Sequence, residues 1–316
     1  MQGPVIGSPS DTPDKRFTKR SLLSIREFLP QAEIILSTWK GADSSGLEFD
    51  KIVFNDDPGA CEYFGGGGGR NNVNRQIVST FDGMRAATRD FVLKLRSDSV
   101  LTGSGFLDYF GRFPQRSHRS VFKEKVVTSS RGSFIPNYRM LLSCYFPSDW
   151  FHFGCREDLL DLWDIPLAPE PETTLWLPPG QTPWRDQNPR LRFAIEQYIW
   201  VSFLRKNFTF VFDSMWDQSE SSIADSELGI GSNLILISPE QASIRSLKYP
   251  EAWGFLDHCR QGCYTHGIWR SLYQEHCRGR RLSVYRFIRL LYWLLFKGGD
   301  CRKFLRGLMR RDGLSV

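Results

Sequence analysis

The chain has 316 residues, of which 41% are hydrophobic, enough to bury the core of one large domain with or without an appended piece. Its formal net charge is +6, and the excess of Lys and Arg gathers toward the C-terminus, which favours anionic partners. No run of about 18 apolar residues exists, so a membrane-spanning helix is not predicted. The seven cysteines follow no disulfide pattern and no segment of the sequence resembles a signal peptide, which predicts a cytoplasmic protein.

The first hundred residues alternate between predicted strands and helices. After a truncated strand at residues 1–7, helical spacing and short apolar runs predict a helix at 17–28, strands at 32–38 and 50–54, a helix at 71–88 and a strand at 91–95. This order predicts an α/β fold with a mostly parallel, Rossmann-like sheet flanked by helices. The C-terminal ends of its strands would gather along one edge, where open α/β sheets bind ligands. Residues that would complete the first strand are missing before Met1, so the chain is expected to begin inside that strand.

The later part of the chain is less regular. Its sequence predicts a short helix at 157–163, a proline-rich loop or lid at 164–190, an amphipathic helix at 191–204 and a strand at 208–212. The glycine run at 65–69 lacks the ordered Gly, Lys and Ser pattern of a phosphate-binding P-loop. An apolar and basic segment at 282–296 predicts a terminal amphipathic helix.

Asp98 is the first candidate for chemistry, because it lies three residues past the end of the predicted buried strand FVLKL. A carboxylate in that place can hold a divalent ion against a diphosphate, although aspartate is also common in plain turns. Two positions earlier stands Arg96, whose guanidinium can contact a diphosphate directly and so reduce the need for a metal.

Several strings of residues together resemble one family. They are QGPV (2–5), SIREFLPQAEIILSTWKG (24–41), DDPG (56–59), NNVNRQIVST (71–80), LKLRSD (93–98) and SDWFHFG (148–154). The chain resembles the WavE lipopolysaccharide-synthesis family, densely over residues 2–165 and loosely beyond. The resemblance implies a GT-A-like glycosyltransferase that uses a nucleotide-diphosphate sugar to build lipopolysaccharide or capsule. The resemblance does not identify the donor sugar, the acceptor or the mechanism.

The resemblance also implies a donor site. Its residues at the strand ends and at one helix start are Gln2, Gly3, Pro4, Thr38, Trp39, Asp56, Asn72, Arg75, Arg96 and Asp98. The N-terminal amides of the helix and Arg75 would meet the diphosphate. Asp98, with His266 as a second ligand, would hold Mn²⁺ or Mg²⁺. Arg96 replaces the first acid of the usual Asp-x-Asp motif, which leaves the dependence on a metal open.

Glu196 and Asp149 are the candidates for the general base that would deprotonate the acceptor hydroxyl. Glu196 lies between apolar neighbours in a predicted helix, either facing solvent or directed into a cleft with a raised pKa. Asp149 either caps a helix or orients the acceptor. A zinc site at Cys259, Cys263, His266 and Cys277 is disfavoured by its spacing.

The expected organisation is a glycosyltransferase domain at 1–275 and a basic amphipathic tail at 276–316. The domain would divide into a nucleotide-sugar half (about 1–110) and an acceptor half (about 111–275). The tail would either pack as a terminal helix or contact the anionic cytoplasmic face of the inner membrane, where a lipid-linked acceptor is reached. Its apolar face is unnecessary for nucleic-acid binding, so no nucleic-acid partner is expected.

Two other functions stay open at this point. A sugar nucleotidyltransferase has a similar sheet, but QGPVIGSPS lacks the basic residue of its nucleotide loop. A non-catalytic glycan-assembly protein could retain the fold without the metal carboxylates.

Overall fold

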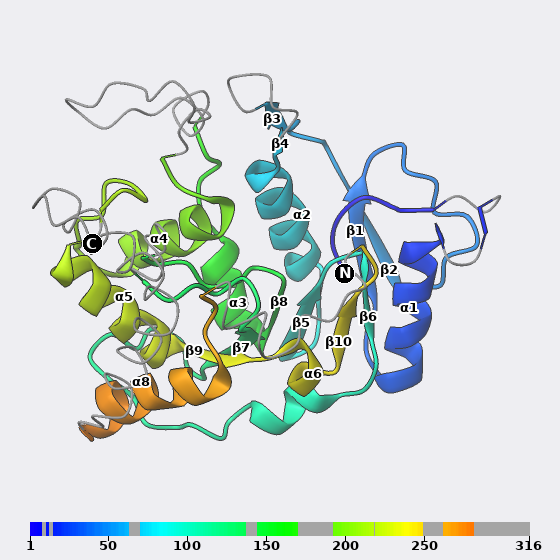
Figure 1. Cartoon of the computed structure of the whole chain (residues 1–316). Coiled ribbons are helices and arrows are strands. Elements are labelled where there is room, and N and C mark those ends of the chain that lie inside the picture. The colour runs from blue at the N-terminus through cyan, green and yellow to red at the C-terminus, as the bar shows by residue number, and fades with distance from the viewer. Residues whose placement is uncertain are drawn as a thin grey trace, which may run out of the picture.

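The structure is a computed structural model that describes residues 1–7, 11–12, 15–62, 70–136, 144–169, 192–217, 219–248 and 262–280. Helices and sheets are mixed through this part of the chain, as the sequence predicts for an α/β fold (Figure 1). Within it, no helix combines the length and the apolar character that crossing a membrane requires. The glycine run, most of the predicted lid and the segment from 281 onward lie outside the described residues.

The N-terminal residues join two groups of strands. β1 (Ile35–Trp39) runs parallel to β2 (Lys51–Asn55). Gln2 makes parallel bridges to Ser37 of β1 and to Arg96, directly after β5 (Phe91–Leu95). Its amide donates to the Leu95 carbonyl over 2.9 Å, and the Gly3 amide donates to the Ser37 carbonyl over 3.1 Å. The predicted first strand is therefore present as a short link between β1 and β5.

Beyond β5 the sheet is of mixed direction. β8 (Phe151–Cys155) pairs antiparallel with both β5 and β7 (Val126–Ser129), and β9 (Leu234–Ile237) pairs parallel with β7. The strand order is thus β2, β1, residues 1–3, β5, β8, β7, β9. Two further antiparallel pairs are β6 (Ser99–Leu101) with β10 (Ile244–Ser246), and β3 (Cys61–Glu62) with β4 (Arg70–Asn71). Within this order β8 alone runs opposite to its neighbours, so parallel pairs lie on both sides of it, and the GT-A-like arrangement stays a prediction.

Helices cover both sides of the strands. α1 (Phe17–Phe28) has the predicted bounds and packs on β6, whereas α2 (Val73–Arg85) packs on β1 and β2. Gly83 lets α2 approach β1 closely. A Cβ at this position would lie only 2.8 Å from the Ser37 Cβ, which is too short for a contact between two carbons. The other helices of the described residues are η2 (Gly105–Tyr109), α3 (Arg156–Trp163), α4 (Ile195–Asn207), α5 (Glu220–Asn233), α6 (Pro239–Ala242) and α8 (His266–Arg278).

Two predicted elements need correction. The helix predicted at 191–204 begins at Ile195, where the Gln197 side chain accepts a hydrogen bond from the Ala194 amide over 3.0 Å. The strand predicted at 208–212 is wrong, since these residues form no strand. Their alternating apolar side chains instead pack on Tyr145, with ring centroids 5.4 Å away for Phe210 and 4.6 Å for Phe212.

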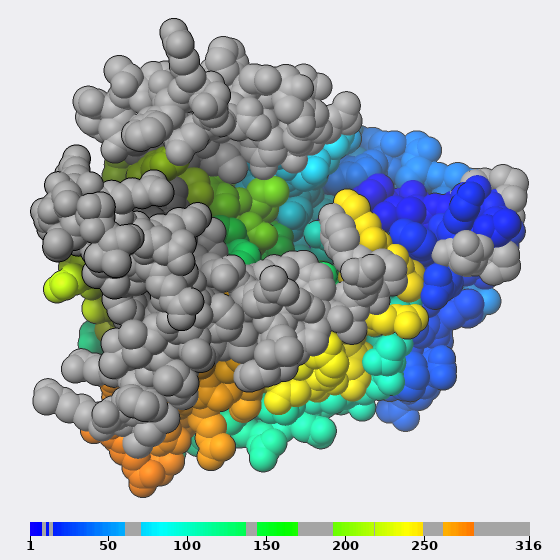
Figure 2. All heavy atoms as spheres, viewed as in Figure 1, coloured from blue at the N-terminus to red at the C-terminus, as the bar shows by residue number. Residues whose placement is uncertain are grey.

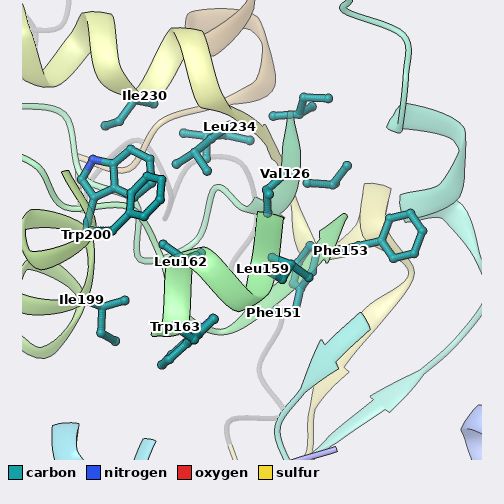
Figure 3. Close-up of a cluster of buried hydrophobic side chains, with 14 of the residues drawn as sticks. Val126, Phe151, Phe153, Leu159, Leu162, Trp163, Ile199, Trp200, Ile230 and Leu234 are labelled. Atoms are coloured by element: carbon teal, nitrogen blue, oxygen red, sulfur yellow. The ribbon is translucent and has the colours of Figure 1, made fainter. Parts of the chain in front are cut away.

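A hydrophobic core lies between α3, α4, α5 and the strands β7, β8 and β9 (Figure 3). Trp163 and Trp200 are almost completely buried in it, and the Phe122 and Phe203 rings stack with centroids 4.8 Å apart. The same cluster continues through Leu22 of α1 to Tyr273 of α8. α8 ends at Arg278, so the predicted tail boundary at residue 276 falls inside this packed helix. The division of the domain near residue 110 stays a prediction.

Candidate active site

Residues 1–3 mark the point in the sheet from which successive strands are added on opposite sides. From there the chain adds β1 and β2 on one side, and then returns to place β5 on the other side. In open α/β sheets, such a switch point leaves a crevice beyond the C-terminal ends of the two diverging strands. A hollow of about 580 Å³ opens at this place. Figure 2 shows the dark blue N-terminal residues on this face, beside the yellow segment around β10.

Eight of the ten predicted donor-site residues line this hollow, which we call the donor pocket. They are Gln2, Gly3, Pro4, Trp39, Asn72, Arg75, Arg96 and Asp98. Thr38 does not, because its side chain is fully buried in the sheet. Asp56 is exposed and pairs with Lys40 over 2.8 Å, while its neighbour Asp57 lines the pocket instead.

Seven lining residues are not among the predicted donor-site residues: Ile6, Phe17, Asp57, Gln76, Ser79, Ser97 and Lys248. Phe17 starts α1, Ser97 lies between Arg96 and Asp98, Asp57 follows Asp56, and Lys248 follows β10. The Leu247 amide donates to the Asp98 carbonyl over 2.8 Å, which brings Lys248 to the pocket. No local pattern could place Lys248 there, because its position depends on a contact between distant parts of the chain.

Gly3 is required by its backbone geometry. Its φ is +120°, and an added Cβ would lie 3.0 Å from the Ser97 hydroxyl oxygen. That hydroxyl donates to the Pro4 carbonyl over 2.7 Å, and the Ser79 hydroxyl donates to Gln2 Oε1 over 2.9 Å. The end of the N-terminal link is thereby held against both β5 and α2.

Arg75 lies in the first turn of α2 and faces the pocket. Its guanidinium donates to both carboxylate oxygens of Asp57, over 2.7 and 2.6 Å, and to Asn72 Oδ1 over 3.1 Å. These hydrogen bonds lower the pKa of Asp57 and raise the pKa of Arg75. Because the pair is partly exposed, it adds at most about 1 kcal/mol to stability. Its main consequence is a fixed cation beside the N-terminal end of a helix, where anions bind favourably.

Arg96 and Asp98 form a second two-pronged ion pair, with distances of 3.0 and 2.8 Å. Burial opposes ionisation of Asp98, but the Arg96 hydrogen bonds and the nearby Lys248 charge outweigh it, so the pKa of Asp98 is lowered. The pocket lining as a whole contains three basic and two acidic side chains, namely Arg75, Arg96 and Lys248 against Asp57 and Asp98. The charge balance of the pocket therefore favours an anionic ligand.

A cluster of charged side chains lies next to this ion pair. The Lys94 ammonium donates to the Asp149 carbonyl oxygen and lies 5.0 Å from the Trp163 ring centroid. Burial lowers the pKa of Lys94 to about 8, although the charges of Asp149, Asp98 and Glu196 oppose the change. The Oδ2 atom of Asp149 is buried and has no hydrogen-bond partner among the described residues.

Glu196, in the first turn of α4, belongs to the same cluster. Burial and then the charge of Asp149 raise the pKa of Glu196 to about 8, against the opposing effect of Arg96 and Lys94. The two predicted base candidates, from distant segments, are thus brought within electrostatic range of each other and of the donor pocket. A carboxyl with such a pKa can accept a proton near neutral pH.

His152 is a buried neighbour of this cluster that does not act as a base. Its Nδ1 atom accepts a hydrogen bond from the Trp163 indole over 3.2 Å, and Nε2 lies 3.1 Å from the Ser148 carbonyl oxygen. Burial and the charge of Lys94 lower the pKa of His152 to about 3. The ring therefore remains neutral at physiological pH and supports the core.

The predicted metal ligands are not brought together. His266 lines a different hollow from Asp98, and its Nδ1 donates to the Leu236 carbonyl over 2.9 Å. Throughout the described ranges, no three His, Cys, Asp or Glu side chains are grouped as metal ligands. For the zinc alternative, Cys259 lies outside those ranges, Cys263 is buried, and Cys277 is a free thiol. Metal binding stays a prediction.

A family model described as WavE lipopolysaccharide synthesis matches residues 1–297. The chain belongs to this family. The resemblance inferred from the sequence strings is therefore confirmed, and the match extends well past residue 165. No curated protein and no solved structure matches the chain. Membership in the WavE family places the protein in lipopolysaccharide synthesis.

Proposed function

We propose that this WavE-family protein is a glycosyltransferase that binds a nucleotide-diphosphate sugar in the donor pocket and transfers the sugar to a growing lipopolysaccharide or capsular glycan. One observation carries the proposal. A pocket at the switch point of the sheet combines three basic side chains with the N-terminus of α2, and it lies beside the carboxylates of Asp149 and Glu196. Charge neutralisation and proton removal are the two tasks of glycosyl transfer to a hydroxyl.

The donor would be held by its two ends. The diphosphate meets Arg75, Arg96, Lys248 and the first amides of α2, because guanidinium groups match phosphate geometry and the helix N-terminus is positive. The nucleoside lies toward Trp39 and Phe17, whose aromatic side chains line the same pocket. A nucleotide site at the switch point, in a sheet with helices on both sides, supports a GT-A-like layout.

The acceptor hydroxyl would be activated by Glu196, with Asp149 as the second candidate. The ionised carboxylate takes the hydroxyl proton, the acceptor oxygen forms a bond to the anomeric carbon, and the bond from that carbon to the diphosphate oxygen breaks. The nucleoside diphosphate leaves with both electrons of that bond. This assignment applies to an inverting reaction, whereas a retaining enzyme would need no such base.

A divalent metal, which the GT-A resemblance implies, fits this donor set poorly. Both oxygens of Asp98 accept hydrogen bonds from Arg96, and Arg96 occupies the position of the usual acidic partner. We therefore assign neutralisation of the diphosphate to the basic side chains Arg75, Arg96 and Lys248. Mn²⁺ or Mg²⁺ held by Asp98 is the alternative that the next experiment tests.

Calorimetric titration with UDP-, GDP- and CMP-sugars, each with and without Mn²⁺, tests the donor site. We expect one nucleotide sugar to bind with similar affinity in both conditions, because Arg75, Arg96 and Lys248 supply the positive charge. Binding that requires Mn²⁺ would restore the metal alternative. If no nucleotide sugar binds, the transferase proposal fails. A ligand that binds but is never hydrolysed or transferred would indicate the non-catalytic alternative.

We also propose that the basic tail contacts the cytoplasmic face of the inner membrane. The sequence from 282 to 296 combines apolar residues with Arg286, Arg289 and Lys297 close by. Replacing these three residues by Gln should weaken co-sedimentation with vesicles that contain phosphatidylglycerol, since each charge contributes about 1 kcal/mol at such a surface. Unchanged co-sedimentation of the triple variant would refute the membrane contact.

A further inference from the structure

A second polar hollow of about 430 Å³ lies between α8 and the loop that follows η2. Figure 1 shows both elements at the lower side of the molecule, away from the N-terminal end of α2. The lining residues are Tyr109, Arg112, Phe113, Gln115, His266, Arg270, Tyr273, Gln274 and Arg278. None of them lines the donor pocket, so this hollow, which we call the arginine pocket, is a separate site.

The spacing of residues along α8 builds one wall of the arginine pocket. His266, Arg270, Gln274 and Arg278 follow one another at intervals of four, which places them in a row along one face of a helix. The other face carries Trp269 and Leu272, which are buried where α8 packs against α5 and β9. The helix is therefore fixed, and its polar row is held toward the hollow.

The three arginines of the pocket have no acidic partner among the described residues. Other arginines in that part of the chain form ion pairs, as Arg26 does with Asp50 and Arg119 with Asp225. No acidic side chain lines the arginine pocket. Three like charges around one concave surface raise its positive potential, which concentrates anions there.

Aromatic rings support the cations. The Arg112 guanidinium lies 5.8 Å from the Tyr109 ring centroid, and the rings of Tyr109 and Phe113 contact His266 edge-on, at 5.1 and 5.8 Å between centroids. The Gln274 side-chain oxygen is buried and has no hydrogen-bond partner among the described residues. The pocket thus offers apolar ring surfaces and one unused acceptor beside its positive charges.

We propose that the arginine pocket binds the phosphate group of a phosphorylated sugar or of a lipid headgroup. Guanidinium groups bind phosphate through paired hydrogen bonds, and Arg112, Arg270 and Arg278 supply three of them. The volume falls within the range of about 300–1,000 Å³ that is typical of small-molecule sites, so it holds more than a phosphate ion. A sugar or glycerol moiety would lie on the aromatic rings, with a hydroxyl donating to Gln274.

Isothermal titration of the full chain with three soluble probes tests this site: inorganic phosphate, glucose 1-phosphate and glycerol 3-phosphate, the last as a headgroup analogue. We expect binding, and we expect the double variant Arg112→Ala/Arg270→Ala to weaken it at least about tenfold, because two charged hydrogen-bonding groups are lost. Both side chains are exposed, so the variant should fold, which an unchanged Tm would check. The preferred probe identifies the source of the phosphate.

Two comparison variants make the result specific. Arg85→Ala removes an exposed arginine at the C-terminal end of α2 and should leave phosphate binding unchanged. Arg75→Ala disrupts the donor pocket and should weaken nucleotide-sugar binding, but not binding of the three probes. The proposal is overturned if no probe binds, if the double variant binds like the wild type, or if Arg75→Ala abolishes the binding. The donor-site proposal is unaffected by these outcomes.

Discussion

Replacing Glu196 by Gln is expected to lower the rate of glycosyl transfer by about 10²- to 10⁴-fold, the usual contribution of a general base. The affinity for the nucleotide sugar should remain unchanged, because Glu196 does not line the donor pocket. The measurement is kcat and KM with the donor that calorimetry identifies. Glu220→Gln is the matched control, since Glu220 also lies in the first turn of a helix but is exposed.

The dependence of the rate on pH gives an independent test of the same residue. A base must be ionised, and the pKa of Glu196 is raised to about 8. The rate should therefore rise with pH, reach half of its maximum near pH 8 and level off above that pH. A rate that is flat above pH 6 would indicate a carboxylate with an ordinary pKa. Full activity in Glu196→Gln together with loss in Asp149→Asn would move the role to Asp149.

Stability distinguishes a catalytic loss from unfolding. The native protein retains a proton on Glu196 at pH values where the unfolded chain, with a pKa near 4.5, has lost it. The free energy of unfolding should therefore fall as pH rises from about 4.5 to about 8. Glu196→Gln removes this dependence, so the inactive variant should be at least as stable as the wild type at pH 8.

Replacing Arg96 by Gln is expected to weaken both the fold and donor binding. The Asp98 carboxylate is 6% exposed and would lose its two-pronged partner. Leaving a buried charge without its partner lowers the free energy of unfolding by about 3 kcal/mol. This is the lower end of the range for buried ion pairs, because the Arg96 side chain is partly exposed. Chemical denaturation of the single variant measures this cost.

The double variant Arg96→Gln/Asp98→Asn separates the two effects. It removes both charges and should regain most of the lost stability, while nucleotide-sugar binding stays at least about tenfold weaker because the diphosphate has lost a guanidinium. Wild-type affinity in the double variant would remove Arg96 from the donor site. Because Arg96 lowers the pKa of Asp98 below its usual 3.8, the pair stabilises the wild type above that pH and loses its effect as the pH falls further.

The two proposed pockets give the protein separate contacts for two anionic groups. The donor pocket lies at the strand ends, whereas the arginine pocket lies between α8 and the loop after η2. If both experiments succeed, a phosphorylated acceptor or lipid could be held by α8 while the donor is held by α2 and β5. Because the two sets of side chains do not overlap, each site can be inactivated without the other.

The sequence by itself determined the elements whose signal is local. Side-chain spacing along a few turns or residues predicts the helix at 17–28 and the strand at 91–95 with their observed bounds. The strand and helix order predicted that the strand ends gather at one edge of the sheet, and the family resemblance implied the donor-site residues at that edge. The family strings added the helix start with Asn72 and Arg75.

Only the tertiary structure decided the contacts between distant segments. It placed Lys248 beside Asp98, brought Glu196 and Asp149 into one cluster with Lys94, and inserted β8 antiparallel between β5 and β7. The wrong strand at 208–212 has the same origin: its apolar side chains serve packing on Tyr145 and no strand pairs with them. Local spacing shows which side chains are apolar, but the partner that buries each one, and the pKa that follows from that burial, depends on the folded chain as a whole.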